Sequence, residues 1–433
     1  MMQSDRLQKW IQNFSQDLEF LSHNFAQAPS GFTLSDLPLL PLSYNGLDIL
    51  LEQELPRMGV KPEQIQAIYP CSPLQEGMLI SAAKGIASYH TRTTCRCDSF
   101  GEPVCPLRLE SAWKVVANRH TVLSSLFTLH PEGNGFIQMV LDKPPVRVIQ
   151  METDDNNPIT VLNKKEPPSF FLNEPQHLLT IYRSKAASVV SFRLDMNHAM
   201  NDAQSMAVLL EELAATYDGF ELPAAPRFTD MISYISQTPK EKTAATWATI
   251  LDGMKPCNFP TSSPSSRGMM PEMIGEVSSS TPHSKVHIVD YCKKTNILFS
   301  AFLQVAWAIT LSHYTGMKEV CFSYLTSGRD APIERVEKMV GPLANLLISR
   351  VDMGVPVKEV LRATSKKSEQ NMAIQHVFIG EVLHRLGLSG QRLFNTSLSI
   401  RSYDKEEVQK YSIKFQTLDD EDGHEVRQNM LWI

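Results

Sequence analysis

The stretch at residues 190–219 constrains the fold more than any other, because its hydrophobic period changes once and abruptly. Its first part alternates apolar and polar residues, which predicts a strand with one apolar face, and His198 is in phase with that face. From Asp202 the apolar residues recur at helical spacing as far as Tyr217, and Gly219 suits the position just past a helix. The sequence therefore predicts a strand, a tight loop and a helix, with His198 at the strand end and Asp202 at or near the helix N-cap.

His198 is the candidate catalytic residue of this unit. A histidine accepts a proton near neutral pH and suits general-base work on an amine or hydroxyl nucleophile. No serine or cysteine nucleophile motif accompanies it, which favours direct attack of one substrate on another. A histidine packed in the core beside a capping aspartate fits the same stretch, so the stretch alone leaves both interpretations open.

The bulk composition excludes several classes of protein. The 433 residues carry a formal net charge of -6, and no basic region of the kind that binds nucleic acid stands out. No apolar run approaches the roughly 18 residues that a membrane helix needs, and the N-terminal segment lacks the apolar core of a signal peptide. We therefore expect a cytoplasmic protein without nucleic-acid or membrane partners.

Cofactor and metal motifs are missing from the sequence. The seven cysteines are odd in number and include no C-x-x-C, so we expect reduced thiols. The cysteines do not lie at metal-ligand spacing, and the one i,i+4 histidine pair, His283 and His287, lies beside a Ser/Pro-rich loop, so no metal site is predicted. The glycine-rich loops that cradle nucleotide phosphates are also absent, so the chain should not activate an acid itself.

The order of predicted elements divides the chain into three parts. Residues 1–60 read as a helical lead-in, with an amphipathic helix near the start. Residues 61–225 and 226–433 each mix strands with helices, and we take them as an N-terminal and a C-terminal lobe. This mixture favours an α/β or α+β fold of two lobes.

Six stretches, in order along the chain, resemble the motifs of the condensation domain of non-ribosomal peptide synthetases, particularly the fungal kind. They are "YPCSPLQEGML" at 69–79, "NRHTVLSSLF" at 118–127, "MNHAMNDAQS" at 196–205, "FTDMISYI" at 228–235, "SGRDAPIERVEKMVGPLANLLISRV" at 327–351 and "FNTSLSIRS" at 394–402. The resemblance spans about residues 40 to 430. The ordered set is far more specific than any single motif.

The resemblance implies a fold and a reaction. The family's two lobes resemble chloramphenicol acetyltransferase and form a V with a tunnel between them. Thiolation (peptidyl carrier) domains dock as donor and acceptor and deliver substrates as phosphopantetheine thioesters, after adenylation domains of the same assembly line have activated them. The acceptor amine attacks the donor thioester and an amide forms, and the domain itself binds no cofactor.

The resemblance also implies roles for residues of this sequence. The family's key histidine falls on His198, and its structural aspartate falls on Asp202. A distant arginine pairs with that aspartate, and we expect this to be Arg350 at the end of "NLLISR". Loss of one partner of such a buried pair should damage folding.

The signature also departs from the family pattern in three places. Asn197 replaces the first histidine, Ala203 replaces the glycine after the aspartate, and Leu346 follows Asn345 where threonine is usual. Fungal terminal, cyclising members relax the same two signature positions and keep a Ser or Thr three residues after the aspartate, as Ser205 does here. We expect Asn197 to support the active site, and Ala203, Ser205 and Asn345 to contribute to substrate binding.

Three functions remain open at this stage. The first is amide formation between carrier-bound substrates, or cyclisation of a carrier-bound peptide. The second is a related acyltransferase that uses free coenzyme A, and the third is a catalytically weak module that binds carriers. After "FNTSLSIRS" the family continues through a further strand and helix, so the different end of this chain suggests either a truncated chain or a shortened C-terminal lobe.

Overall fold

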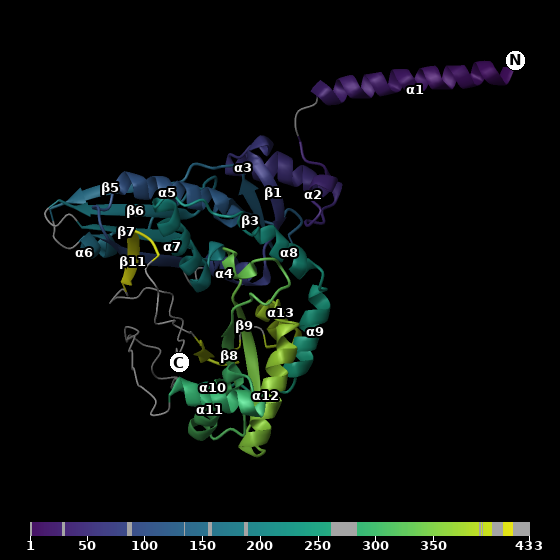
Figure 1. The fold of residues 1–433 in the computed structure, drawn as a ribbon. Coiled ribbons are helices and arrows are strands. Elements are labelled where there is room, and N and C mark those ends of the chain that lie inside the picture. Colours follow the sequence, from purple (N-terminus) through teal and green to yellow (C-terminus); the bar gives the residue numbers. More distant parts are fainter. Residues whose placement is uncertain are drawn as a thin grey trace.

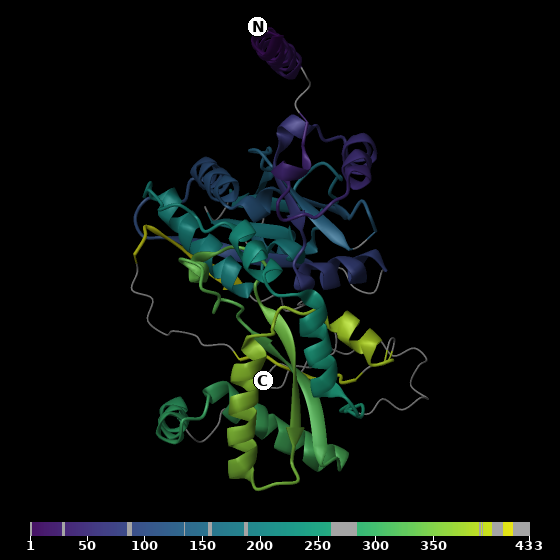
Figure 2. The ribbon, with the colours of Figure 1, turned by 90° about the vertical axis from the view of Figure 1, so that its right-hand side faces the viewer.

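A computed structural model describes most of the chain, and Figures 1 and 2 show it from two sides. The described residues are 2–27, 31–84, 89–133, 135–154, 158–185, 189–260, 284–388, 391, 393–400 and 410–418. The helices are α1 (Met2–Gln27), α2 (Tyr44–Ile49), α3 (Leu55–Met58), α4 (Pro73–Ala83), α5 (Pro106–Arg119), α6 (Pro158–Lys164), α7 (Ala203–Tyr217), α8 (Phe228–Ser236), α9 (Lys240–Leu251), α10 (Lys285–Thr295), α11 (Phe299–Thr315), α12 (Val357–Met372) and α13 (Ile379–Arg385). The strands are β1 (Ile65–Pro70), β2 (His90–Ser99), β3 (Ser125–Leu129), β4 (Phe136–Leu141), β5 (Val148–Thr153), β6 (His177–Ser184), β7 (Val190–Asn197), β8 (Glu319–Thr326), β9 (Asn345–Asp352), β10 (Ser397–Leu398) and β11 (Ile413–Leu418). Much of the C-terminal end that departs from the family pattern, residues 401–409 and 419–433, lies outside the described residues.

The first lobe is built on a five-stranded sheet in the order β11-β2-β7-β6-β5. β7 lies at its centre and runs antiparallel to both β2 and β6. Helices α5 and α7 pack against each other, and their apolar residues join Phe192 and Leu194 of β7 in one core cluster. A smaller antiparallel sheet, β1-β4-β3, has a core cluster of its own that takes in apolar residues from Leu37 onward.

The second lobe is built on the sheet β10-β8-β9. β8 and β9 form a long antiparallel pair that runs from Glu319 opposite Asp352 to Thr326 opposite Asn345. Helices α11 and α12 pack together and against these strands, and Trp247 of α9 lies in the same core cluster. In Figures 1 and 2 this lobe lies below the first.

Three segments that follow residue 225 pack with the first lobe. α8 contributes Phe228 and neighbouring apolar residues to the first core cluster, and the loop 327–344 between β8 and β9 contributes Met339. β11 pairs with β2 along its whole length and completes the larger sheet. The core of the first lobe therefore takes residues from both sides of the expected boundary at residue 225.

The first helix stands apart from both lobes. Figure 1 shows α1 projecting away from the body of the molecule. The amphipathic helix expected near the start of the chain is present, but its apolar residues are 47–70% exposed: Leu7, Trp10, Ile11, Phe14, Leu18, Phe20 and Leu21.

No single helix among the described residues is long and apolar enough to cross a membrane. α10 and α11 reach the necessary length and apolar character only when they are taken together, and the chain bends by 106° between them.

Candidate active site

The strand end that carries His198 lies at the centre of the larger sheet. β7 is buried along nearly its whole length, and a single helical turn, His198–Met200, follows it directly. The carboxylate of Asp202 then accepts a hydrogen bond from the backbone N–H of Ser205 (2.8 Å) and caps α7. The predicted strand, loop and helix are confirmed, and Asp202 is the N-cap residue.

The imidazole of His198 is fixed through one of its two nitrogens. Its Nδ1 lies 2.7 Å from the carbonyl oxygen of Asn201, and its backbone N–H donates to the carbonyl of Tyr89 (2.8 Å). A carbonyl oxygen only accepts, so Nδ1 carries the proton and Nε2 of the neutral ring is the proton acceptor. Nε2 has no hydrogen-bond partner among the described residues, and the side chain is half-buried. This is the tautomer that a general base requires.

The residues around His198 brace its loop from two sides. The Asn197 side chain accepts from the backbone N–H of Ala199 (2.8 Å) and donates to Gln176 (2.6 Å). Gln75, buried on α4, donates from Nε2 to the carbonyl of Ala199 (2.8 Å). Asn197 therefore bonds the loop that carries His198, and its supporting role in the reaction stays a prediction.

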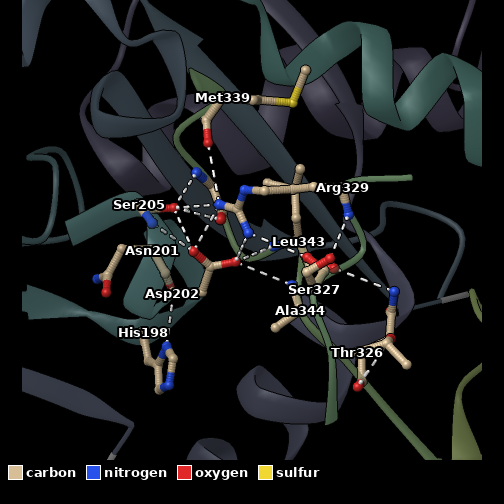
Figure 3. A network of polar contacts seen from close by, with 12 residues as sticks. His198, Asn201, Asp202, Ser205, Thr326, Ser327, Arg329, Met339, Leu343 and Ala344 are labelled. Atoms are coloured by element: carbon tan, nitrogen blue, oxygen red, sulfur yellow. Dashed lines mark hydrogen bonds and ion pairs between the residues drawn. The ribbon is translucent and has the colours of Figure 1, made fainter. Parts of the chain in front are cut away.

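Asp202 is held by a set of donors that we call the Asp202 clamp: Arg329, Ser205 and the backbone N–H groups of Leu343 and Ala344 (Figure 3). Arg329 donates from both Nη atoms, one to each carboxylate oxygen, each at 2.8 Å. The two N–H groups bond Oδ2 at 3.0 and 3.1 Å. All of these donors except Ser205 come from the loop 327–344, which connects β8 and β9 of the second lobe. The clamp therefore joins the first lobe to the second.

Burial and pairing act in opposite directions on Asp202. Burial raises the pKa of this carboxyl. The hydrogen bonds and charge of Arg329 and the hydrogen bonds of Ser205 together outweigh the effect of burial and hold the pKa below its ordinary value. The two side chains are only 7% and 6% exposed. A buried bidentate pair of this kind leaves a costly uncompensated charge when either partner is removed.

The expected pairing of Arg350 with Asp202 is wrong. Arg350 instead bonds Glu319 through Nε (2.8 Å) and Nη2 (3.1 Å), near the far end of the β8–β9 pair. Asn345 begins β9 beside the clamp, and Arg350 lies five residues further along the strand. At about 3.3 Å per residue this places it roughly 17 Å away along the strand. Arg329 takes its place, because a left-handed turn at Gly328 (φ 63°) directs the chain back toward Asp202.

The other predicted site residues occupy different surroundings. Ser205 is fully buried, and its hydroxyl donates to Asp202 (2.7 Å) and accepts from the N–H of Gly341 (3.0 Å). Asn345 is buried and donates to the carbonyl of Leu343 (3.2 Å). Ser205 and Asn345 therefore both bond residues of the loop 327–344, whereas Ala203 is exposed on the first turn of α7. Contact of these residues with a substrate stays a prediction.

Two functional candidates were not singled out from the sequence. Arg329 lies in the "SGR" segment, but its partner becomes evident only from the turn at Gly328. Gln75 lies in the "YPCSPLQEGML" segment, and nothing in its spacing indicates a contact 124 residues away. Among the described residues, no group of three or more His, Cys, Asp or Glu side chains is placed to hold a metal ion.

Comparison with known proteins agrees with this geometry. The family model described as "Condensation domain" matches residues 65–428. The chain is 32% identical over 436 residues to the nonribosomal peptide synthetase ungA' of Aspergillus campestris, covering 97% of this chain and 4% of that protein. It is 31% identical over 415 residues to the nonribosomal peptide synthetase nlsA of Emericella nidulans, covering 94% of this chain and 7% of that protein. The chain therefore spans only a small part of the length of these relatives.

Solved structures agree at the level of the fold. The structure described as holo T3CT superposes with a TM-score of 0.65 at 19% identity, covering 88% of this chain and 85% of that chain. The first condensation domain of the calcium-dependent antibiotic synthetase superposes with a TM-score of 0.59 at 18% identity, covering 81% and 85%. The expected mixed α/β fold is confirmed, and the chain belongs to the condensation-domain family.

Proposed function

We propose that this chain forms an amide bond between two substrates that arrive as thioesters on the phosphopantetheine arms of carrier domains. The observation that carries this proposal is the fixed tautomer of His198, whose Nδ1–H donates to the carbonyl of Asn201 and leaves Nε2 as the acceptor. The donor and acceptor carriers, and the adenylation domains that load them, belong to the remainder of an assembly line, which we place in the cytoplasm.

In the proposed reaction the amine of the acceptor substrate attacks the thioester carbonyl of the donor. A C–N bond forms and the C–S bond breaks. Nε2 of His198 takes a proton from the attacking nitrogen, and the leaving thiolate receives a proton, so the balance is one amide and one free thiol. No acyl group becomes attached to the chain in this scheme, because the sequence shows no serine or cysteine nucleophile motif beside His198.

The first test removes the imidazole. In single-turnover assays with loaded carriers we expect His198→Ala to lose about 10²–10⁴-fold in rate, the usual contribution of a general base. His198→Gln keeps a polar side chain of similar size and should lose as much. Melting temperatures close to that of the wild type would exclude misfolding as the cause. An undiminished rate in both variants would contradict the base role and favour pure positioning of the substrates.

The second test addresses the source of the acyl group. One acyl group is offered on a carrier domain, on a short arm mimic and on coenzyme A, all at equal micromolar concentration. We expect the carrier-bound form to react much faster, because docking raises the local concentration of the arm. Equal rates for all three would favour the coenzyme A-dependent acyltransferase.

The departures at Asn197 and Ala203, together with Ser205, favour a cyclising reaction as a second candidate. A carrier-bound peptide with a free N-terminal amine, supplied without any acceptor carrier, distinguishes the two. Release of a cyclic product would support cyclisation, and product formation only when an acceptor carrier is present would support condensation between two carriers.

A further inference from the structure

Gln375 lies outside the Asp202 clamp, yet it bonds both segments that supply the clamp. It follows α12 and is 2% exposed. Its Nε2 donates to the carboxylate of Asp330 at 2.8 and 2.9 Å. Its Oε1 accepts from Thr326 (3.1 Å) and Asn345 (3.2 Å). Both ends of this one amide are therefore used, and they join the end of β8 and the loop after it to the start of β9.

These contacts connect Gln375 to Asp202 by two routes, one through Asp330 and Arg329 and the other through Asn345 and Leu343. Asp330 directly follows Arg329 in the chain, and Asn345 also donates to the carbonyl of Leu343 (3.2 Å). Arg329 and the N–H of Leu343 both bond the carboxylate of Asp202. Gln375 therefore links the segment of Arg329 to the segment of Leu343, and none of its hydrogen bonds among the described residues goes to Asp202 or His198.

The segment around Gln375 has further contacts on both sides. The carbonyl of Ile374 accepts from Nε1 of Trp247 on α9 (2.8 Å), within the second lobe. On the other side, the ring of Phe378 would lie 3.5 Å from a Cβ added at Gly77 of α4, the helix that braces the loop of His198. The segment is thus anchored in the second lobe and lies against the first.

We propose that Gln375 is a positioning residue for His198: by fixing the spacing of the clamp it holds the 201–202 segment, so that the carbonyl of Asn201 stays aligned with Nδ1 of His198. This inference rests on the proposed function, in which Nε2 acts as the base. Gln375 acts through Asp330, Asn345 and the clamp, with no contact to the substrate.

The principal variant is Gln375→Glu in the full chain. The new carboxylate keeps the shape of the side chain, loses the donor to Asp330 and places two acceptors against each other. Adding Asp330→Asn returns a donor from the opposite side, so the double variant Gln375→Glu/Asp330→Asn should restore the contact. Asp330→Ala serves as a milder variant, because Asp330 is exposed and its removal adds no buried charge.

The matched control is Gln304→Glu. Gln304 is also buried in the second lobe, where its Nε2 donates to Ser368 (3.3 Å) and its Oε1 accepts from Ser349 (2.9 Å). It takes no part in the clamp. It should lower the melting temperature as Gln375→Glu does, without affecting His198.

Two measurements test the positioning role. The first is the ¹⁵N spectrum of the imidazole nitrogens without substrate, with the His198 signals identified by their loss in His198→Ala. Wild type and Gln304→Glu should show a single tautomer with Nδ1 protonated, and Gln375→Glu a mixture of both. The second is the single-turnover rate with saturating carriers, corrected for the folded fraction. The rate of Gln375→Glu should fall at least about tenfold, with the KM for the carrier unchanged within about twofold and with a changed pH profile of the rate. The rate of Asp330→Ala should fall less, and the rate of the double variant should return toward that of the wild type.

The two measurements separate this inference from the proposed function. An unchanged His198 spectrum in Gln375→Glu and Asp330→Ala, or a rate loss that Gln304→Glu reproduces, would overturn the positioning role. A changed spectrum in Gln375→Glu, with full activity in His198→Ala, would instead support the positioning of His198 while overturning its role as the base.

Discussion

Two arginines 21 residues apart in the second half of the chain show how differently an ion pair can be used. Arg329 bonds Asp202 with both Nη atoms across the two lobes, and its side chain is 7% exposed. Arg350 bonds Glu319 within one lobe, on neighbouring strands, with the two side chains 23% and 39% exposed. The first pair is enclosed by backbone donors and the second faces solvent.

The contrast follows from dielectric surroundings more than from distance, because both pairs have a shortest separation of 2.8 Å. An exposed pair gains little, since water screens the attraction and side-chain entropy opposes it. A buried pair is costly to assemble and costlier to leave half-made. Removing each arginine in turn therefore tests whether the clamp depends on burial.

The largest effect should come from Arg329→Met, which keeps the stem and removes the charge. Asp202 would then be buried without its main partner, and we expect the free energy of unfolding to fall by about 3–5 kcal/mol. Asp202→Asn should cost a comparable amount, and the double variant should cost less than the sum. Urea unfolding checks all three, and strictly additive losses would show that the two side chains do not interact.

Gly328→Ala should cost less, about 1–3 kcal/mol from backbone strain, because Gly328 has a φ of 63°. A Cβ there would also lie 1.8 Å from the carbonyl oxygen of Leu343, so the clamp must shift. Gly316→Ala is the matched control, with a φ of 70° and no atom within 4 Å of the added Cβ. Equal melting temperatures for the two variants would show that the turn at Gly328 tolerates displacement.

Lowering the pH should reduce the difference in the free energy of unfolding between the wild type and Arg329→Met. Because the pKa of Asp202 is lowered in the folded protein, its stabilising contribution is present above its unfolded value near 3.8 and is lost as the pH falls through the folded value. In the variant, the hydrogen bonds and charge of Arg329 no longer lower the pKa of Asp202, so its carboxyl takes up a proton at a higher pH than in the wild type. Unfolding at pH values from 7 down to 4 should show this difference shrinking, whereas a constant difference would mean that Asp202 is not the group responsible.

The smallest effect should come from Arg350→Met, at most about 1 kcal/mol, since its pair with Glu319 is partly exposed. High salt should remove most of that difference, because screening acts on exposed charges. A loss as large as that of Arg329→Met would show that the carbonyls of Ile250 and Asp252, which Arg350 also bonds, contribute most of its stabilisation.

The sequence predicted local units well and contacts between distant units poorly. The strand, loop and helix around His198 follow from a change of hydrophobic period within one short stretch, and the N-cap at Asp202 follows from the same stretch. The partner of Asp202 does not, because it depends on how β8 and β9 pair and on a turn at Gly328. Arg329 and Arg350 both lie in the segment that resembled the family, but Arg329 lies in the loop beside Asp202 and Arg350 lies near the far end of β9.

The division into lobes shows the same limit on a larger scale. Alternating strands and helices predicted two mixed lobes, which the fold contains. The sequence did not predict that three later segments pack with the first lobe: α8, the loop 327–344 and β11. For β11 the reason is that a strand pattern does not specify which sheet edge the strand joins. Gln375 was missed for a similar reason, since its role comes from contacts to three residues that lie 30 to 49 positions earlier in the chain.

The pairing of β11 with β2 has a consequence for anyone who exchanges parts between such chains. β11 comes from the last described segment, yet it covers the edge of a sheet whose other strands all come from the first half of the chain. A hybrid joined near residue 225 would pair one parent's edge strand with the other parent's sheet, including the contact of Phe415 with Phe192 at 5.2 Å between ring centroids. The natural unit of exchange is therefore spatial: residues 413–418 belong with residues 90–99, whichever parent supplies the chain between them.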